Sequence, residues 1–422
     1  MAEESILTDD FLRELINVGE VDILVGVPTY NDAATVGQVV QAIRAGLLQY
    51  FPRQRAVIIN ADGGSKDATQ DLVRAASISD LQPGSNLQTL RTLHCISTHY
   101  PGGPASGKAL HTILAAADLL RATSCVVVSA DSTNFKTESV VSLLQPVCRD
   151  TFDLVTPVYE RHKFDGLLVR NLVYPMTRAL YSRRVREPYA PDFAFSGRLA
   201  SYFLGQDIWA QEVVRDGAEL DLTISAISGG FRLAQSFLGA KSRAEHAATD
   251  LVPAMRRTAG VLFWSLEQNF SGWSTNVGSE PVPSIGPEPE VSLEPLRVNR
   301  KRLYEMFARG VADLAPVLKS ILSDQTFAEL ERTAALPEEN FYYSNELWVR
   351  TVYEFAASYH KTVISRDHIV QALVPLYRGK THTFLVENRD ASGAEVESNV
   401  EALCLAFEEM KPYLLEMWDG RK

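Results

Sequence analysis

The chain has 422 residues, a formal net charge of −11 at pH 7 and 46% hydrophobic residues. This composition is that of an ordinary globular protein, and the length predicts two or three domains. The acidic balance argues against nucleic acid as the main partner, because a phosphate backbone requires a basic face. The cysteines at 95, 125, 148 and 404 have no metal-ligand spacing and are expected to be buried thiols.

The first ten residues carry acids and no apolar core, so we expect neither a signal peptide nor a stable membrane anchor. No run approaches the roughly 18–20 apolar residues of a membrane span. Together with the cysteine pattern, these features predict a cytoplasmic protein.

Strands and helices are expected to alternate over the first 130 residues, after a leading helix that ends near Gly19. The apolar runs predict strands at 21–27, stopping at Pro28, and at 56–60, 92–97 and 125–130. Helical spacing predicts helices at 35–48, 67–77 and 108–122. This alternation predicts an α/β fold with a mostly parallel sheet flanked by helices.

The rest of the chain is expected to change from mixed to helical. We expect a strand at 154–159 and a helix at 167–183, and residues 221–227 lead into 231–238, which ends in a strand. Residues 276–296 are rich in proline and predict a linker. Four helical segments follow, at 298–308, 314–323, 346–360 and 366–377. The expected domains are therefore 1–275, α/β, and 297–422, helical.

Polar residues follow three of the predicted strands. They are Pro28–Asp32, Asp62–Ser65 and Asp131–Asn134. In a parallel sheet ligands bind at the carboxyl ends of the strands, so these clusters predict one shared ligand site. Taken singly, each of the first two is also explained as a turn in which Asn31, Asp32 or Ser65 caps the next helix.

Two of these clusters carry recognisable patterns. Pro28-x-Tyr30-Asn31-Asp32 follows the first strand, and Asp62-x-Gly64-Ser65-x-Asp67-x-Thr69 follows the second. The pair resembles the nucleotide-binding motifs of GT-A glycosyltransferases of the family 2-like group, over about residues 21–245. The resemblance implies that Asp62 contacts the base of a nucleotide-sugar and that Pro28, Tyr30 and Asp32 line the same pocket.

The glycine-rich stretch from Gly102 to Lys108 opens a predicted helix. Backbone N–H groups at such a helix start can bind an anion, and Lys108 adds a positive charge. The spacing is not that of a P-loop. The resemblance implies that Lys108 lies in the nucleotide-sugar pocket, and a flexible loop with a solvated lysine is the alternative.

The resemblance also implies a divalent cation, Mg²⁺ or Mn²⁺, held by Asp131. GT-A enzymes use two carboxylates at this position, and here Thr133 replaces the second. Arg243 stands where related enzymes carry a metal-binding histidine, with His246 three residues on. Hard cations prefer charged oxygen ligands, so we expect weak metal dependence. Lys108, Lys241 or Arg243 would then neutralise the diphosphate.

Two acids are candidates for catalysis. Asp221 resembles the acid that faces the acceptor in the second half of the GT-A fold, and Asp192 is a second candidate. An acid at a helix start is the alternative for Asp221. The basic residues Arg161, His162, Lys163 and Arg170 are candidates for binding an anionic acceptor.

The closest resemblance is to the mannosylglycerate synthase and glucosyl-3-phosphoglycerate synthase group. It implies transfer of a hexose from a GDP- or UDP-linked donor to a small polar acceptor such as glycerate. A homo-oligomer is left open. The alternatives are a transferase that builds a polysaccharide, a protein that binds nucleotide-sugars without turnover, and a nucleotidyltransferase. The last usually has a basic glycine-rich loop after the first strand, which this chain lacks.

Overall fold

The computed structural model describes residues 6–78, 93–100, 103, 106–132, 135–241, 251–287 and 298–418. The chain forms two compact units. The first consists of Met1–Glu160, Ala190–Ala247 and Val282–Val291, and the second of Arg161–Tyr189, Ala248–Pro281 and Ser292–Lys422. The division therefore differs from the boundaries expected from sequence, because 161–189 and 248–281 group with the C-terminal helices.

The first unit is built on an eight-stranded sheet with the order β10-β8-β5-β7-β4-β1-β2-β3. All described strand pairs in it are parallel except those of β7, which runs antiparallel to both β4 and β5. The strands are β1 (Ile23–Thr29), β2 (Ala56–Asp62), β3 (His94–His99), β4 (Ser124–Val127), β5 (Leu154–Glu160), β7 (Phe193–Ser196), β8 (Leu233–Ala240) and β10 (Ser284–Ile285).

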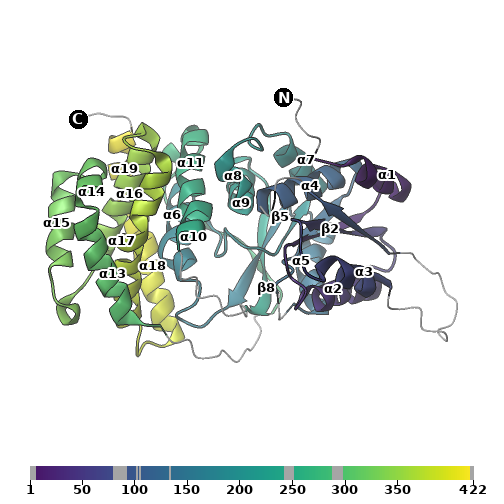
Figure 1. Cartoon of the computed structure of the whole chain (residues 1–422), viewed down its shortest axis with the longest axis horizontal. Helices are drawn as coiled ribbons and strands as arrows, with labels where there is room; N and C mark the ends of the chain where they lie inside the picture. The colour runs from purple at the N-terminus through teal and green to yellow at the C-terminus, as the bar shows by residue number, and fades with distance from the viewer. Residues whose placement is uncertain are drawn as a thin grey trace. The chain divides into compact units, whose positions relative to one another are not determined.

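Helices cover both faces of this sheet, with α2, α3 and α5 on one side and α4, α7 and α9 on the other (Figure 1). This double cover explains why the central strands read as continuous apolar runs. Residues such as Val25, Ile58 and Val126 pack with Val36 and Val140 in the core under α2 and α5. The helices are α1 (Asp9–Val18), α2 (Val36–Tyr50), α3 (Thr69–Ile78), α4 (Ser106–Leu119), α5 (Thr137–Asp150), α7 (Gly197–Leu204), α8 (Glu212–Arg215) and α9 (Ala218–Ser228).

The predicted α/β class, with a mostly parallel sheet and a helical C-terminal part, is confirmed. The expected end of the first strand at Pro28 is wrong, because β1 continues to Thr29 and Pro28 pairs with Ala61 of β2. Proline has no N–H for a sheet hydrogen bond. It is tolerated here because β4 pairs with β1 only as far as Gly26.

The second unit is helical. Its N-terminal part contains η1 (Val169–Val173), α6 (Tyr174–Tyr181), α10 (Val252–Met255), η2 (Arg256–Gly260), α11 (Val261–Gln268) and α12 (Phe270–Ser274). Its C-terminal part contains α13 (Arg300–Asp313), α14 (Ala315–Ile321), α15 (Asp324–Ala334), η3 (Glu338–Asn340), α16 (Asn345–Lys361), α17 (Arg366–Glu387), α18 (Gly393–Glu409) and α19 (Lys411–Trp418). The sequence did not predict α15, α18 or α19.

A buried arginine makes ion pairs that link sequence-distant parts of this unit. Arg178 of α6 is fully buried, and its guanidinium donates to Glu401 at 2.5 and 2.7 Å and to Glu408 at 2.7 Å, both on α18. This explains why 161–189 belongs with the helical unit.

The proline-rich segment contains two short strands. β9 (Glu280–Pro281) pairs with β6 (Arg183–Arg184) in the second unit, and β10 pairs with β8 at the edge of the main sheet. Edge positions tolerate proline, because one side of the strand makes no sheet hydrogen bonds. None of the helices in the described ranges is long and apolar enough to cross a membrane.

Candidate functional site

The loops after β1 and β2 are joined by side chain to backbone hydrogen bonds. The backbone N–H of Asn31 donates to Ser65 Oγ at 2.9 Å, and the N–H of Lys66 donates to Asn31 Oδ1 at 2.8 Å. The N–H of Asp32 donates to Thr69 Oγ1 at 2.8 Å. Asn31 has a φ of +58°, a conformation that asparagine tolerates better than most residues. The two motifs singled out in the sequence therefore form one surface.

Asp62 is the last residue of β2 and is fully buried beneath these loops. Its Oδ1 accepts from Thr29 Oγ1 at 3.0 Å and Ser65 Oγ at 2.5 Å. Its Oδ2 accepts from the N–H groups of Gly64 and Ser65 at 3.0 and 2.9 Å, and from Gln70 Nε2 at 2.7 Å. Burial alone would raise the pKa of Asp62, but the hydrogen bonds from Ser65, Gln70 and Thr29 hold it below its usual value.

These five donors exceed the roughly four lone-pair positions of a carboxylate. In this conformation Asp62 therefore orders the loop, and it has no lone pair left for a ligand.

The other residues of the first motif are more accessible. Tyr30 is 42% exposed on the loop after β1, and Pro28 is half-buried in the strand. Burial raises the pKa of Asp32, and repulsion from Asp131, Asp67 and Asp62 adds to this, against a hydrogen bond from the Tyr30 N–H. β1 pairs in parallel with both β2 and β4, so the carboxyl ends of these three strands lie at one edge of the sheet, as the sequence predicted.

Asp131 follows β4 and is exposed, and its Oδ1 accepts from Ser129 Oγ at 2.5 Å. Thr35 Oγ1 donates to the Ala130 carbonyl at 2.6 Å, which ties this loop to the start of α2. Thr133 and Arg243 lie outside the described residues. Within the part of the chain that the structure describes, no three Asp, Glu, His or Cys side chains are grouped to hold a metal ion.

The reversed direction of β7 brings Asp192 to the same edge of the sheet. β7 is antiparallel to β4, with Phe193 opposite Val127, so the residue before β7 lies beyond the carboxyl end of β4. Asp192 is only 2% exposed there. Its Oδ1 accepts from the N–H of Ser129 at 2.9 Å.

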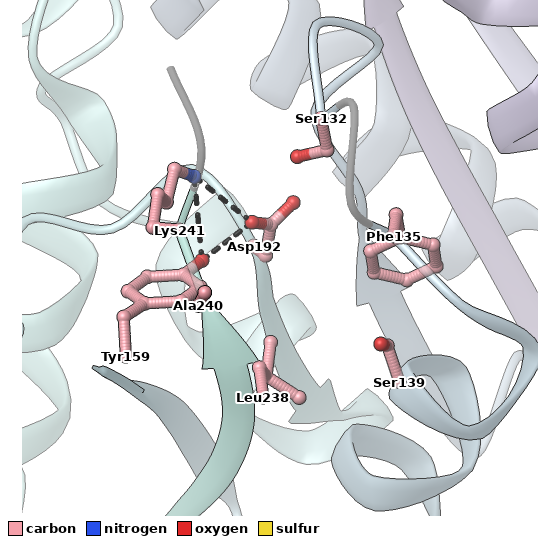
Figure 2. A pocket seen from close by; sticks show the side chains of 8 residues that line it. All are labelled: Ser132, Phe135, Ser139, Tyr159, Asp192, Leu238, Ala240 and Lys241. Atoms are coloured by element: carbon pink, nitrogen blue, oxygen red, sulfur yellow. Dashed lines mark hydrogen bonds and ion pairs between the residues drawn. The ribbon is translucent and has the colours of Figure 1, made fainter. Parts of the chain in front are cut away.

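Asp192 forms a compact polar group with Tyr159 and Lys241 (Figure 2). Lys241 Nζ lies 3.2 Å from Asp192 Oδ2, and the Tyr159 hydroxyl donates a short hydrogen bond to the same oxygen. The Lys241 ammonium also lies 4.6 Å from the centre of the Tyr159 ring. Tyr159 and Lys241 come from the neighbouring carboxyl ends of β5 and β8. A buried lysine and a buried aspartate thus compensate each other's charge.

This group forms part of the wall of a small pocket that is open to solvent on one side. Figure 2 shows Lys241, Tyr159 and Asp192 on one side of it and Ser132, Phe135 and Ser139 on the other. The pocket is lined by Ser132, Phe135, Ser139, Tyr159, Asp192, Leu238, Ala240 and Lys241. An ammonium, hydroxyls and a carboxylate beside apolar side chains suit a polyhydroxylated or anionic ligand.

Lys108 and Asp221 do not line this pocket. Lys108 is half-buried in the first turn of α4, and Asp221 is 2% exposed in the first turn of α9. Close packing explains the glycine before Lys108, because a Cβ on Gly107 would lie 2.4 Å from the Val214 carbonyl oxygen. Of the two acids singled out for catalysis, only Asp192 lines the pocket.

Tyr159 was not among the residues singled out from the sequence, although the strand that carries it, β5, was predicted. In the second unit, the basic residues that were candidates for an anionic acceptor have protein partners. Arg161 Nε donates to Glu187 at 2.8 Å and its Nη1 to Asp165 at 3.1 Å. Lys163 Nζ donates to the carbonyl of Arg389 at 2.8 Å.

No protein-family model matches the chain, and a search of curated proteins found no match. The chain is similar to solved structures of glucosyl-3-phosphoglycerate synthase from Mycobacterium tuberculosis. The complex of that enzyme with Mn²⁺, UDP and glucosyl-3-phosphoglycerate is 22% identical, with a TM-score of 0.44, over 64% of this chain and 87% of that chain. Its complex with phosphoglyceric acid is 21% identical, with a TM-score of 0.44, over 62% and 84%. Its complex with Mn²⁺, UDP-glucose and phosphoglyceric acid is 19% identical, with a TM-score of 0.42, over 64% and 86%.

Proposed function

We propose that this protein is a GT-A glycosyltransferase that moves a hexose from a UDP- or GDP-linked donor to a small hydroxy acid such as glycerate or phosphoglycerate. The observation that carries the proposal is the Asp192–Tyr159–Lys241 pocket, at the same sheet edge as the Pro28–Asp32 and Asp62–Thr69 loops. A nucleoside would bind along these loops, and the reacting sugar would enter the pocket.

The proposed donor site uses exposed residues for contact and buried ones for support. Tyr30, Pro28 and Asp32 would contact the nucleoside. Lys108 and Arg243 would bind the diphosphate. Asp62 would position the loop rather than touch the ligand, because five protein donors already occupy its carboxylate.

In the transfer step, the bond from the anomeric carbon to the diphosphate oxygen breaks and a bond from that carbon to the acceptor hydroxyl oxygen forms. The nucleoside diphosphate leaves, and the hydroxyl proton passes to Asp192 Oδ1. This oxygen accepts one hydrogen bond, from Ser129, among the described residues, whereas Oδ2 accepts two.

Lys241 would supply positive charge to the leaving diphosphate. A fixed charge aimed at negative charge that develops in the transition state is among the strongest catalytic effects. Two of the three ammonium hydrogens are directed to Asp192 and Tyr159, at 3.2 and 3.5 Å, which leaves one for the ligand.

A second candidate function is binding of nucleotide-sugars without turnover. It is favoured by the lack, in the described residues, of a set of carboxylates suited to a divalent cation. The position of Asp221 also favours it, because this acid, singled out for catalysis, is buried in α9 and does not line the pocket.

The test is a thermal-shift panel of UDP-, GDP- and ADP-sugars with and without Mg²⁺ or Mn²⁺. It is followed by incubation of each stabilising donor with glycerate or 3-phosphoglycerate and mass spectrometry of the products. We expect stabilisation by one nucleoside diphosphate class and a product heavier than the acceptor by one hexose residue. Stabilisation without product would favour the binding protein, and no stabilisation by any nucleotide would defeat both.

A further inference from the structure

Three residues form a row across the ends of β1, β2 and β3. Thr29 pairs with Asp62, and Asp62 pairs with His99, each as the last residue of its strand. Because side chains alternate along a strand, residues in register on neighbouring strands point to the same face of the sheet. His99 therefore lies at the same sheet edge as Asp62, beside the loop that follows β2.

One side of the His99 ring is fixed by the backbone. The Nδ1 of His99 lies 3.1 Å from the carbonyl oxygen of Asp62. A carbonyl oxygen only accepts hydrogen bonds, so Nδ1 must carry the hydrogen. In the neutral ring, Nε2 is then an acceptor, and it has no hydrogen-bond partner in the described part of the chain.

The ring is also held by close packing against Gly64. This glycine has a φ of +90°, and a Cβ there would lie 3.0 Å from His99 Cε1. The absence of a side chain at 64 lets the ring lie against the loop. His99 itself is exposed, so its free edge is accessible to a ligand bound at this end of the sheet.

The carboxylate of Asp62, the residue expected from sequence to read the base, is occupied by five protein donors. We propose that His99 Nε2 reads the base instead, by accepting a hydrogen bond from a ring N–H. The N3–H of uracil and the N1–H of guanine supply such a hydrogen. Cytosine and adenine have an acceptor nitrogen there, so His99 disfavours them. This inference rests on the proposed function.

The experiment compares the binding of UDP and CDP by calorimetry, since these ligands differ at the ring nitrogen that His99 would read. In the wild-type protein UDP binds more tightly than CDP. For His99→Ala we expect the Kd for UDP to rise about 3- to 10-fold, the range for one neutral hydrogen bond, with little change for CDP. His99→Phe keeps an aromatic ring without the acceptor, and we expect it to lose the same discrimination. His99→Gln offers a carbonyl acceptor and should regain part of it.

The matched control is His94→Ala, because His94 is exposed at the other end of β3. It should leave both affinities unchanged. If the ratio of the UDP and CDP affinities in His99→Ala and His99→Phe stays as in the wild-type protein, the role of His99 is overturned. The proposed function is then left standing. Absence of UDP and GDP binding in the wild-type protein would overturn both.

Discussion

Gln70 Nε2 donates a 2.7 Å hydrogen bond to Asp62 Oδ2, which joins the first turn of α3 to the loop after β2. This is one of the five hydrogen bonds that the buried carboxylate accepts. Removing Gln70 should therefore cost less stability than removing Asp62. Loss of Gln70 removes one donor, whereas loss of Asp62 leaves several donors without an acceptor.

Asp62→Ala is expected to lower the free energy of unfolding by about 2–4 kcal/mol, because buried donors that lose their acceptor are costly. Chemical denaturation measures this loss. The variant should also lose stabilisation by UDP or GDP, because the loop is no longer ordered. Gln70→Ala is the milder companion, with an expected loss of about 1 kcal/mol. Full stabilisation of Asp62→Ala by UDP or GDP would show that the loop does not depend on Asp62.

The same carboxylate predicts a pH dependence of stability. The pKa of Asp62 is lower in the folded protein than in the unfolded chain, so the unfolded chain binds the proton more tightly. The stability that Asp62 contributes is present above its unfolded pKa of about 3.9. It is lost as pH falls through the lower pKa of Asp62 in the folded protein. Asp62→Asn should therefore show a shallower loss of stability below about pH 4 than the wild-type protein in denaturation series. Parallel curves would exclude Asp62 as a source of the acid sensitivity.

Removal of the Lys241 ammonium should affect both stability and activity. In Lys241→Met, Asp192 becomes a buried charge without its cation, which typically costs about 3–5 kcal/mol. The double variant Lys241→Met/Asp192→Asn should recover much of this, because both charges are gone. If Lys241 stabilises the leaving diphosphate, both variants should lose about 10²–10³-fold in kcat. A double variant with near-normal kcat would remove Lys241 and Asp192 from the mechanism.

Chelation of metal ions should have a limited effect. Asp131 is the only acid of the expected Asp-x-Asp pair, because Thr133 stands in place of the second. We expect that activity measured in EDTA stays close to that in Mg²⁺ or Mn²⁺. Complete loss in EDTA, restored by added metal, would contradict this expectation.

Two helical glycines give opposite predictions for substitution by alanine. A Cβ on Gly107 would lie 2.4 Å from the Val214 carbonyl oxygen and 2.7 Å from that of Arg215, whereas one on Gly37 would meet nothing within 4 Å. Gly107→Ala is therefore expected to lower the free energy of unfolding by about 1–3 kcal/mol, since α4 and α8 must separate. Gly37→Ala is expected to raise it by about 0.4–1 kcal/mol, because alanine favours the helix. Thermal denaturation of both variants should show a lower Tm for Gly107→Ala and a higher Tm for Gly37→Ala. Equal Tm values would show that α8 moves away from α4 without loss of stability.

Much of the first unit follows from local sequence. Apolar runs such as 56–60 and 125–130 mark strands because strands covered on both faces need apolar side chains throughout. The polar clusters that follow them are brought to one edge by parallel pairing alone, which is why the meeting of the loops at Asp32, Asp62 and Asp131 was predictable. The strand ends were less so, as Pro28 shows.

What only the tertiary structure decided is which side chains face one another. The contact of Asp192 with Lys241 spans 49 residues and depends on the reversed direction of β7, which no local pattern encodes. The enclosure of Asp62 depends on Thr29 and Gln70, which approach it from two different elements. Likewise, segment 161–189 joins the helical unit through the Arg178 ion pairs rather than through its position in the chain. Sequence periodicity reports the faces that an element buries, whereas the partner of each side chain is set by long-range packing.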